Sequence, residues 1–375
     1  MRRLAARKEH GMGMRVLAAL ALLAAIATGA SADTAWRGVH VMAWGPAGGS
    51  EGLPVLKRAI DGVLRPLGVN VLVYEVGYNF AFDSHPDMRF GKTISKDEAR
   101  ELARFCRDRG IRLIPQFNCL GHQSWAKQNM IFPLMSVHPE FEEVPDVPDA
   151  KRPKMLKNWC PLHPEVYPVV FDLMDEIAEA FEADAFHVGM DEVLVFASPK
   201  CPRCAGKAPA DLFAHAVNEL HGHIVGKRGW TMLMWGDRLL DASVPGMGEG
   251  WSASDKKTAP AIDAIPKDII ICDWHYNARE SYPSIDLFVQ KGFRVWPASW
   301  KDKAAGLRQV EYARNDTTGR ILGYLGTSWV IAPGHFAQAL LGEGDPAVLS
   351  DRALPAAKVL KECMTAIRQT DAPHP

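Results

Sequence analysis

Eight short apolar stretches, most of them rich in β-branched residues, recur along the chain and alternate with stretches whose apolar residues have helical spacing. The predicted strands are Gly38–Trp44, Val69–Val76, Ile111–Phe117, Ala185–Met190, Thr231–Trp235, Ile269–Trp274, Phe293–Pro297 and Ile321–Trp329. Apolar strands that alternate with helices are typical of a parallel sheet covered on both faces. Eight such units close into a barrel, so the pattern predicts an α/β fold of the (β/α)8 TIM-barrel class.

A doubly wound open sheet is the main alternative. Such sheets usually carry a glycine-rich G-x-G-x-x-G turn after the first strand, and residues 45–49 read Gly-Pro-Ala-Gly-Gly instead. No linker divides residues 33–375, and the Pro-rich stretch Val144–Pro153 indicates an insertion loop. We therefore expect one barrel domain over residues 33–375.

The N-terminal segment has the pattern of a secretory signal. A basic residue, Arg15, precedes an apolar run that ends in Ala30-Ser31-Ala32, a small-residue cleavage site. We expect residues 1–32 to be a signal peptide cleaved after Ala32, with Met14 as a possible start, and the mature protein to be exported to the periplasm or the medium. An uncleaved membrane anchor is the alternative, although the run is short for a bilayer span.

Composition limits the possible partners. The chain has 375 residues, 47% hydrophobic and 23% charged, with a net charge of -1. Without residues 1–32 it has 38 basic and 43 acidic residues, a net charge of -5. Such a chain folds as a globular protein and offers no basic field for nucleic acid. We expect neither a nucleic-acid partner nor a stable membrane anchor after cleavage, and the oligomeric state stays open.

Seven cysteines are scattered through the chain, and only Cys201 and Cys204 have an informative spacing. One C-x-x-C pair is half of a zinc ribbon, and the sequence shows no second half. We therefore expect a local disulfide or two free thiols there, and neither a metal nor a cofactor.

The predicted strand ends carry carboxylates together with aromatic residues. In a barrel the functional site lies at the C-terminal ends of the strands. The residues at or just after these ends are Trp44, Glu75, Tyr78, Asn118, His122, Asp191, Glu192, Trp235, Asp237, Asp273, Trp274, His275, Tyr276, Trp300 and Trp329. Pyranose rings stack their C–H faces on aromatic planes and bond carboxylates through their hydroxyls. Five of the 11 tryptophans fall in this set, which favours a sugar site over mere filling of the barrel mouth.

The fourth strand ends in an adjacent Asp191–Glu192 pair. Neighbouring side chains of a strand face opposite ways, so both can serve one site only if the backbone turns there. Most glycosidases hold two carboxyl groups about 5 Å or more apart across the scissile bond. An adjacent pair does not obviously give that geometry, and it favours one carboxylic acid with a helper.

The segment His187-Val188-Gly189-Met190-Asp191-Glu192 resembles the H-x-G-x-D-E signature of glycoside hydrolase family 20, the β-N-acetylhexosaminidases. Further likenesses cover most of residues 36–335: the third-strand segment that leads to Gly121-His122, His163–Tyr167, Met234–Asp237 and Gly326–Trp329. The likeness is strongest to the compact branch related to hexosaminidase D.

The resemblance implies an exo-acting, retaining enzyme that hydrolyses terminal N-acetylglucosamine or N-acetylgalactosamine by substrate-assisted catalysis. It assigns Glu192 as general acid and base, and Asp191 as the group that orients the substrate acetamide. The implied substrate-binding residues are Glu75, His122, His187, Trp235, Asp237, Trp274, Tyr276 and Trp329. In this assignment the tryptophans wall the acetamide pocket, Tyr276 bonds the acetamide oxygen, and Glu75 and Asp237 contact hydroxyls. The two histidines orient neighbouring carboxylates.

The sequence departs from the family at the first strand, which ends in Trp44 and has no Arg for the outer sugar hydroxyls. Glu75 also stands where many members have an Asp pair. Both departures leave the choice between gluco and galacto sugars open. Two alternatives remain: a sugar-binding barrel without turnover, and a metal-dependent hydrolase that uses His122, His187 and Asp237.

Overall fold

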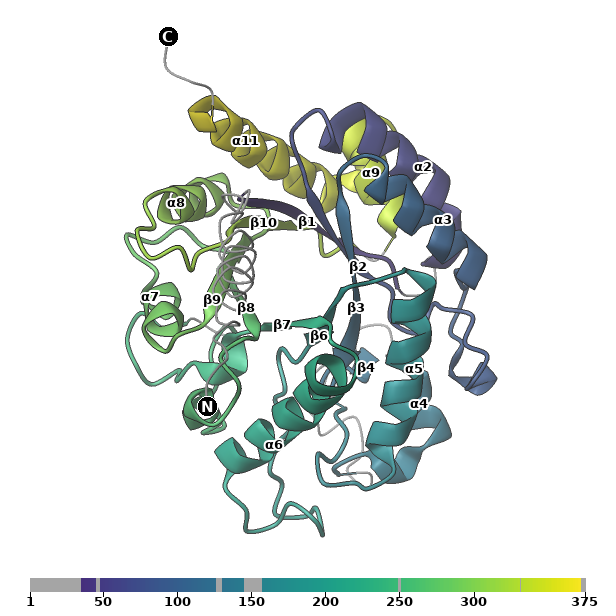
Figure 1. The fold of residues 1–375 in the computed structure, drawn as a ribbon, viewed down its shortest axis with the longest axis vertical. Coiled ribbons are helices and arrows are strands. Elements are labelled where there is room, and N and C mark those ends of the chain that lie inside the picture. The colour runs from purple at the N-terminus through teal and green to yellow at the C-terminus, as the bar shows by residue number, and fades with distance from the viewer. Residues whose placement is uncertain are drawn as a thin grey trace, which may run out of the picture. The chain divides into compact units, whose positions relative to one another are not determined.

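The structure is a computed structural model, and it describes residues 35–44, 48–125, 130–144, 157–248, 251–330 and 332–371. Residues from Trp36 onward form one compact unit, in which helices surround a closed ring of strands (Figure 1). The predicted signal peptide, residues 1–32, lies outside the described residues, as does most of the Pro-rich stretch. None of the described helices has the length and apolar character that crossing a bilayer requires.

Eight parallel strands form the barrel in the order β1–β10–β9–β8–β7–β6–β3–β2. Their bounds are β1 Trp36–Met42, β2 Val71–Glu75, β3 Arg112–Cys119, β6 Ala185–Gly189, β7 Thr231–Trp235, β8 Ile270–Trp274, β9 Arg294–Ser299 and β10 Gly323–Thr327. A two-stranded hairpin, β4 Ser124–Trp125 and β5 Met130–Ile131, follows β3. The predicted TIM-barrel fold is confirmed.

Helices connect most successive strands on the outside of the barrel. They are α2 Leu53–Ala59, α3 Lys96–Arg107, α4 Pro133–Val137, α5 Val166–Ala180, α6 Pro209–His221, α7 Pro283–Gln290, α8 Lys303–Arg314, α9 Pro333–Leu341, α10 Pro346–Leu349 and α11 Ala353–Asp371. Between β7 and β8 the described chain instead makes 3-10 turns at Asp237–Leu239 and Ala259–Asp263. Ser95 caps α3 in a capping box with Glu98.

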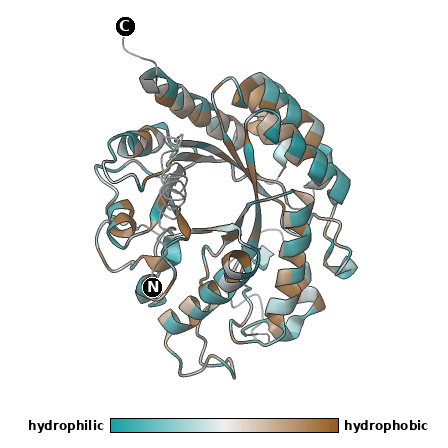
Figure 2. Cartoon of the chain, in the orientation of Figure 1, coloured by the Kyte–Doolittle hydropathy of each residue, from teal (hydrophilic) through white to brown (hydrophobic). Residues whose placement is uncertain are grey.

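The barrel interior is filled by inward side chains from the strands, and the helices carry hydrophobic and hydrophilic faces (Figure 2). Toward the N-terminal end, Trp296 of β9 packs against Trp36 and Gly38 of β1, and a Cβ on Gly38 would lie 2.0 Å from its ring. Above it, Trp235 lies against His40 and His187, with ring centroids 5.8 Å and 4.7 Å apart. This layer lies beneath the strand ends, and a pocket opens above it at the C-terminal mouth.

Most predicted strand bounds differ from the observed ones by one or two residues, and those of β1 and β10 differ for identifiable reasons. β1 begins at Trp36 because Trp36 and Arg37 already pair with β10. β10 is shorter than Ile321–Trp329: Ile321 makes one isolated bridge, and the backbone leaves the sheet before Trp329, whose φ is 42°. The sequence pattern predicted all eight barrel strands but neither β4 nor β5, and it does not show where strand pairing begins or where the backbone turns.

Candidate active site

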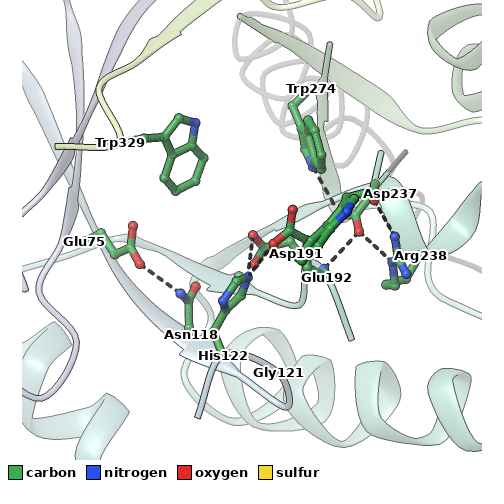
Figure 3. A network of polar contacts seen from close by, with 12 residues as sticks. Glu75, Asn118, Gly121, His122, Asp191, Glu192, Asp237, Arg238, Trp274 and Trp329 are labelled. Carbon is green, nitrogen blue, oxygen red and sulfur yellow. Dashed lines mark hydrogen bonds and ion pairs between the residues drawn. The ribbon is translucent and has the colours of Figure 1, made fainter. Parts of the chain in front are cut away.

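A pocket of about 240 Å³ opens at the C-terminal mouth of the barrel. Its lining residues are Met42, Trp44, Glu75, Asn118, His122, Trp125, Asp191, Glu192, Trp274, Tyr276, Trp300, Trp329 and Arg352. The polar groups gather on one side around the end of β6, and aromatic rings face them (Figure 3).

The Asp191–Glu192 pair enters this pocket because the backbone turns sharply at the end of β6. Gly189, Met190 and Glu192 have φ values of 68°, 75° and 49°. This left-handed region is unusual for residues with a side chain. A Cβ on Gly189 would lie 2.2 Å from Asn118 Oδ1, so glycine is required where β6 passes β3. The sequence required a backbone turn here if both carboxyl groups were to serve one site. The observed turn provides it, and both carboxyl groups face one pocket although they are neighbours in the chain.

His122, in the loop after β3, contacts both carboxyl groups. Its Nε2 lies 3.2 Å from Asp191 Oδ2 and 3.5 Å from Glu192 Oε2. Burial by itself would lower the pKa of His122, but the attraction of Asp191 and Glu192 outweighs it and raises the pKa to about 10. Burial likewise acts to raise the pKa of Asp191, and the charge of His122 outweighs it and lowers that pKa. The two groups therefore form a buried ion pair at neutral pH.

Glu192 has the opposite electrostatic environment from Asp191. Burial raises the pKa of Glu192 to about 7, the charges of Asp191 and Asp237 add to the rise, and His122 opposes it. At neutral pH a substantial fraction of this carboxyl group carries a proton. One carboxylate held ionised beside one carboxylic acid is the division of roles that acid–base chemistry on a sugar requires.

Asp237 holds this arrangement from behind. Its Oδ2 accepts hydrogen bonds from the Glu192 backbone N–H at 3.0 Å and from Arg238 Nε at 2.6 Å, and its Oδ1 accepts one from Trp274 Nε1 at 3.2 Å. Asp237 is 1% exposed, Arg238 is fully buried, and Asp237 does not line the pocket. Its role is to fix the turn after β6 and the ring of Trp274.

The opposite side of the polar group is built around Glu75 at the end of β2. Glu75 Oε1 accepts hydrogen bonds from Trp44 Nε1 and from Asn118 Nδ2, the latter at 2.8 Å, and its Oε2 lies 2.9 Å from His40 Nε2. His40 lies on β1, Trp44 two residues after it and Asn118 on β3, and β1 and β3 flank β2 in the barrel. They hold the Glu75 carboxyl group in place at the pocket wall.

Four aromatic residues form the facing wall. Trp274 and Tyr276 stack with centroids 4.8 Å apart, and Tyr276 meets the edge of Trp300 at 5.7 Å. The Trp329 indole N–H donates to the Tyr276 hydroxyl at 2.5 Å. The Trp300 indole N–H is already used, because it donates to the Ser328 carbonyl oxygen. The wall is therefore apolar except at the Tyr276 hydroxyl.

Seven of the ten residues named from the sequence line the pocket: Glu75, His122, Asp191, Glu192, Trp274, Tyr276 and Trp329. The other three, His187, Trp235 and Asp237, lie behind it. Trp235 and His187 are fully buried inside the barrel, where the Trp235 ring packs against His187 and His40. Trp235 was predicted to form part of the pocket wall, and this is corrected. It instead lies behind Trp329 and supports it, with the two ring centroids 5.6 Å apart.

The predicted hydroxyl contact of Asp237 and the predicted orienting role of His187 are corrected as well. Both carboxylate oxygens of Asp237 accept hydrogen bonds from protein groups, so neither is free for a sugar hydroxyl. Nδ1 of His187 accepts a hydrogen bond from the Gly189 backbone N–H, so this side chain braces the strand end and orients no carboxylate directly. Burial lowers the pKa of His187 to about 3, and the imidazole is neutral.

Sequence reasoning gave no role to Met42, Trp125 or Arg352. Met42 and Trp125 have no pattern that marks them. Arg352 lies between α10 and α11, more than twenty residues beyond the last strand, where no strand-end argument reaches. Its Nη1 donates to the Trp329 carbonyl oxygen at 3.3 Å, and its guanidinium lies 5.7 Å from the Trp300 ring centroid.

The metal-dependent alternative finds no support in the geometry. Within the described ranges, His122, His187 and Asp237 do not bring ligand atoms together, and the one group of three close ligand atoms consists of Cys160, Cys201 and Cys204.

Comparison with known proteins places this site in a family. Residues 73–320, more than half of the chain, match the catalytic domain of glycosyl hydrolase family 20. The chain belongs to this family.

Its relatives extend beyond the matched regions. A beta-hexosaminidase of Akkermansia muciniphila is 31% identical over 114 residues, which are 29% of this chain and 21% of that protein. A beta-hexosaminidase of Emericella nidulans is 30% identical over 245 residues, 57% of this chain and 34% of that protein. The chain thus spans about a fifth to a third of the length of these relatives. The crystal structure of Flavobacterium johnsoniae chitobiase superposes with a TM-score of 0.60 at 17% identity, over 90% of this chain and 52% of that chain.

Proposed function

We propose that this protein is an exo-acting, retaining β-N-acetylhexosaminidase that removes terminal N-acetylglucosamine or N-acetylgalactosamine by substrate-assisted catalysis. The observation that carries the proposal is the Asp191–Glu192 turn, which directs two adjacent carboxyl groups into one pocket and gives them opposite pKa shifts. Membership of glycosyl hydrolase family 20 supports it independently.

The carboxyl groups divide the chemistry between them. Glu192 donates its proton to the glycosidic oxygen while the substrate's own acetamide oxygen attacks the anomeric carbon. The glycosidic C–O bond breaks, the alcohol leaves, and a cyclic oxazolinium forms. The Glu192 carboxylate then takes a proton from water as the water oxygen attacks the same carbon and reopens the ring. Two displacements at one carbon retain its configuration.

Asp191 is suited to hold the acetamide. Its Oδ2 faces His122, whereas its Oδ1 has no hydrogen-bond partner among the described residues. A buried carboxylate oxygen without a partner is costly, and an acetamide N–H would satisfy it. The negative charge of Asp191 also stabilises the positive charge that develops on the acetamide nitrogen.

Tyr276 is placed to fix the acetamide oxygen. Because the Trp329 indole donates to the Tyr276 hydroxyl, the phenol can donate its own proton to an oxygen in the pocket. Trp274 and Trp329 provide apolar faces for the acetamide methyl group and the sugar ring. The pocket volume of about 240 Å³ is below the ~300–1,000 Å³ typical of sites for drug-sized ligands, which supports action on one terminal sugar.

Arg352 supplies a positive charge at a pocket whose first strand ends without an arginine. Its guanidinium is held by the Trp329 carbonyl oxygen beside the aromatic wall. We assign it to the outer hydroxyls of the terminal sugar, where its fork of donors can bond two oxygens. The glycan partner is neutral, which agrees with the mildly acidic mature chain.

Export to the periplasm or the medium is part of the proposal, and it rests on the pattern of residues 1–32. N-terminal sequencing of the protein secreted by the native cell should begin at Asp33. Recovery of the uncleaved chain from the cytosol would contradict export.

The activity test compares aryl N-acetyl-β-glucosaminide, aryl N-acetyl-β-galactosaminide and the plain aryl β-glucoside. Only the two acetamido sugars should be hydrolysed, because the plain sugar lacks the internal nucleophile. Equal or greater activity on the plain glucoside would refute substrate assistance. Calorimetric binding of the sugar without hydrolysis of any hexosaminide would favour the non-hydrolytic alternative.

Glu192→Gln keeps the side-chain shape and removes the proton. We expect kcat to fall by about two to four orders of magnitude, the usual range for general acid–base catalysis, with the thermal midpoint retained. Glu165→Gln, at an exposed position before α5, is the matched control and should keep wild-type kcat. A Glu192→Gln variant with near-normal kcat would remove Glu192 from the mechanism.

A further inference from the structure

Three cysteine sulfurs meet in a buried cluster outside the pocket. Cys160 comes from the segment that precedes α5, and Cys201 and Cys204 come from the loop that follows the catalytic strand β6. Cys160 Sγ lies 3.4 Å from Cys204 Sγ and 3.5 Å from Cys201 Sγ, and all three sulfurs lie within 4.8 Å of one another. Each of the three residues is at most 1% exposed. The cluster supplies the third ligand that the lone C-x-x-C pair lacked in the sequence.

The spacing of the sulfurs fits a shared metal ion. A tetrahedral zinc ion with Zn–S distances of about 2.3 Å places its sulfurs roughly 3.8 Å apart, close to the two distances observed here. A disulfide needs a sulfur–sulfur distance of about 2.05 Å, and it would pair two of the sulfurs and leave the third buried beside them. All seven cysteines are free thiols in the structure.

Backbone N–H groups and one basic side chain lie close to two of the three sulfurs. The Leu162 backbone N–H donates to Cys160, two residues before it in the chain. The Arg203 and Cys204 backbone N–H groups donate to Cys201 in the same way. Such donors stabilise negative charge on sulfur. The positive Arg203 side chain also interacts electrostatically with Cys160, which offsets the excess negative charge that three thiolates leave around a divalent ion.

We propose that Cys160, Cys201 and Cys204 bind a thiophilic divalent metal ion, with Zn²⁺ the best match to three thiolates in a tetrahedral site. The fourth position is taken by water or by a neighbouring oxygen. Glu143 interacts electrostatically with both Cys160 and Cys204. Its oxygens also accept hydrogen bonds from the Ser198 backbone and from Asn158, so it already joins the same two segments.

The site is structural, since none of its cysteines lines the pocket. The segment that carries Cys160 reaches the catalytic loop through Trp159, whose backbone N–H donates to the Leu120 carbonyl oxygen two residues before His122. An ion that joins this segment to the loop after β6 therefore braces both sides of the His122–Asp191 pair.

The test is metal content, measured on the full chain without any reference to hydrolase activity. Protein refolded or purified with Zn²⁺ and then desalted should carry about one zinc per chain by elemental analysis, and all seven thiols should react after denaturation. Replacement by Co²⁺ should give the intense near-ultraviolet charge-transfer absorption of thiolate ligation. Cys201→Ser and Cys204→Ser should each lower the retained zinc at least tenfold.

Cys363→Ser is the matched control, because Cys363 is also fully buried but lies against α8 and Tyr324, away from the cluster. It should keep its zinc. The proposal is overturned if the wild-type protein binds no zinc and shows no Co²⁺–thiolate band. It is also overturned if only five of the seven thiols react after denaturation, because that count reveals a disulfide. The wild-type measurements decide the matter even if a variant fails to fold, and they do not depend on the proposed hydrolase activity.

Discussion

The charge on His122 should set the alkaline limit of activity. In the wild type, burial and the charges of Asp191 and Asp237 raise the pKa of Glu192 to about 7, and the His122 cation opposes that rise. The acid form of Glu192 is the active one, so kcat/KM should fall as the pH rises through about 7. His122→Gln removes the opposing cation, so the alkaline limb should move to higher pH.

The structure sets the size of this shift. His122 Nε2 and Glu192 Oε2 are 3.5 Å apart, and two unit charges at this distance interact by about 5 kcal/mol at an effective dielectric constant of ~20. At about 1.36 kcal/mol per pH unit, the upper bound is a shift of between three and four pH units. Protonation of Asp191 in the variant reduces this shift, so we expect the alkaline limb to move by at least one pH unit. kcat should fall as well, because Asp191 loses its counter-ion.

The assay is the pH dependence of kcat/KM on aryl N-acetyl-β-glucosaminide between about pH 4 and 10. His163→Gln, a buried histidine that does not line the pocket, is the control and should leave the limb in place. The electrostatic account would be refuted if the alkaline limb of the kcat/KM profile of His122→Gln stayed at the wild-type pH or moved to lower pH.

The same pair predicts how stability depends on pH. The pKa of His122 is raised from its ordinary 6.5 to about 10 in the folded state. Its contribution to stability is therefore complete below pH 6.5 and is lost as the pH rises through about 10. The wild-type thermal midpoint should decline over this window, and His122→Gln should flatten the decline. A wild type equally stable at both ends would contradict the buried ion pair.

Two further substitutions separate support from substrate contact. Asp237→Ala leaves the fully buried Arg238 without its carboxylate, and it should lower the free energy of unfolding by about 3–5 kcal/mol in urea titrations. A loss below about 1 kcal/mol would contradict the positioning role. Arg352→Ala should raise KM roughly 10- to 100-fold by loss of charged hydrogen bonds with kcat nearly unchanged. Lys301→Ala is its control, because Lys301 also lies over Trp300, 4.4 Å from the ring centroid, but does not line the pocket. Equal KM in both variants would remove Arg352 from substrate recognition.

Much of this site follows from the strand ends, because a parallel barrel brings all eight C-terminal strand ends to one face. Glu75, His122, Asp191, Glu192, Trp274, Tyr276 and Trp329 reach the pocket on that ground alone. The strand ends also named Tyr78, Trp235, Asp237, Asp273 and His275, and none of these lines the pocket. Alternation along a strand tells which residues point inward, but it does not tell how deep in the barrel each one lies.

Contacts between distant segments were beyond sequence reasoning. Arg352 reaches the mouth because the turn between α10 and α11 contacts Trp329, just after β10, and Cys160 joins Cys201 and Cys204 because two loops meet. Neither contact has a spacing that a single sequence displays. The fully paired state of Asp237 was hidden for the same reason, since it depends on Arg238, Trp274 and the Glu192 backbone.

The turn after β6 gives a last prediction that separates local strain from pocket geometry. Gly189 has a φ of 68°, and a Cβ there would lie 2.2 Å from Asn118 Oδ1 and 3.0 Å from Asn118 Cα. Gly110 has a φ of 70° with nothing within 4 Å of such a Cβ. Both Gly→Ala variants bear the same backbone cost, about 1–2 kcal/mol, and Gly189→Ala must in addition displace β3 from β6.

Displacement of β3 shifts Asn118 and moves His122 away from Asp191. Gly189→Ala should therefore lose kcat by at least tenfold and lower the thermal midpoint further than Gly110→Ala, which should keep wild-type kcat. Urea unfolding and steady-state kinetics of the two variants make the comparison. Equal stability and equal kcat in both would mean that the close approach of β3 and β6 does not set the geometry of the carboxyl pair. The left-handed backbone alone would then account for the turn.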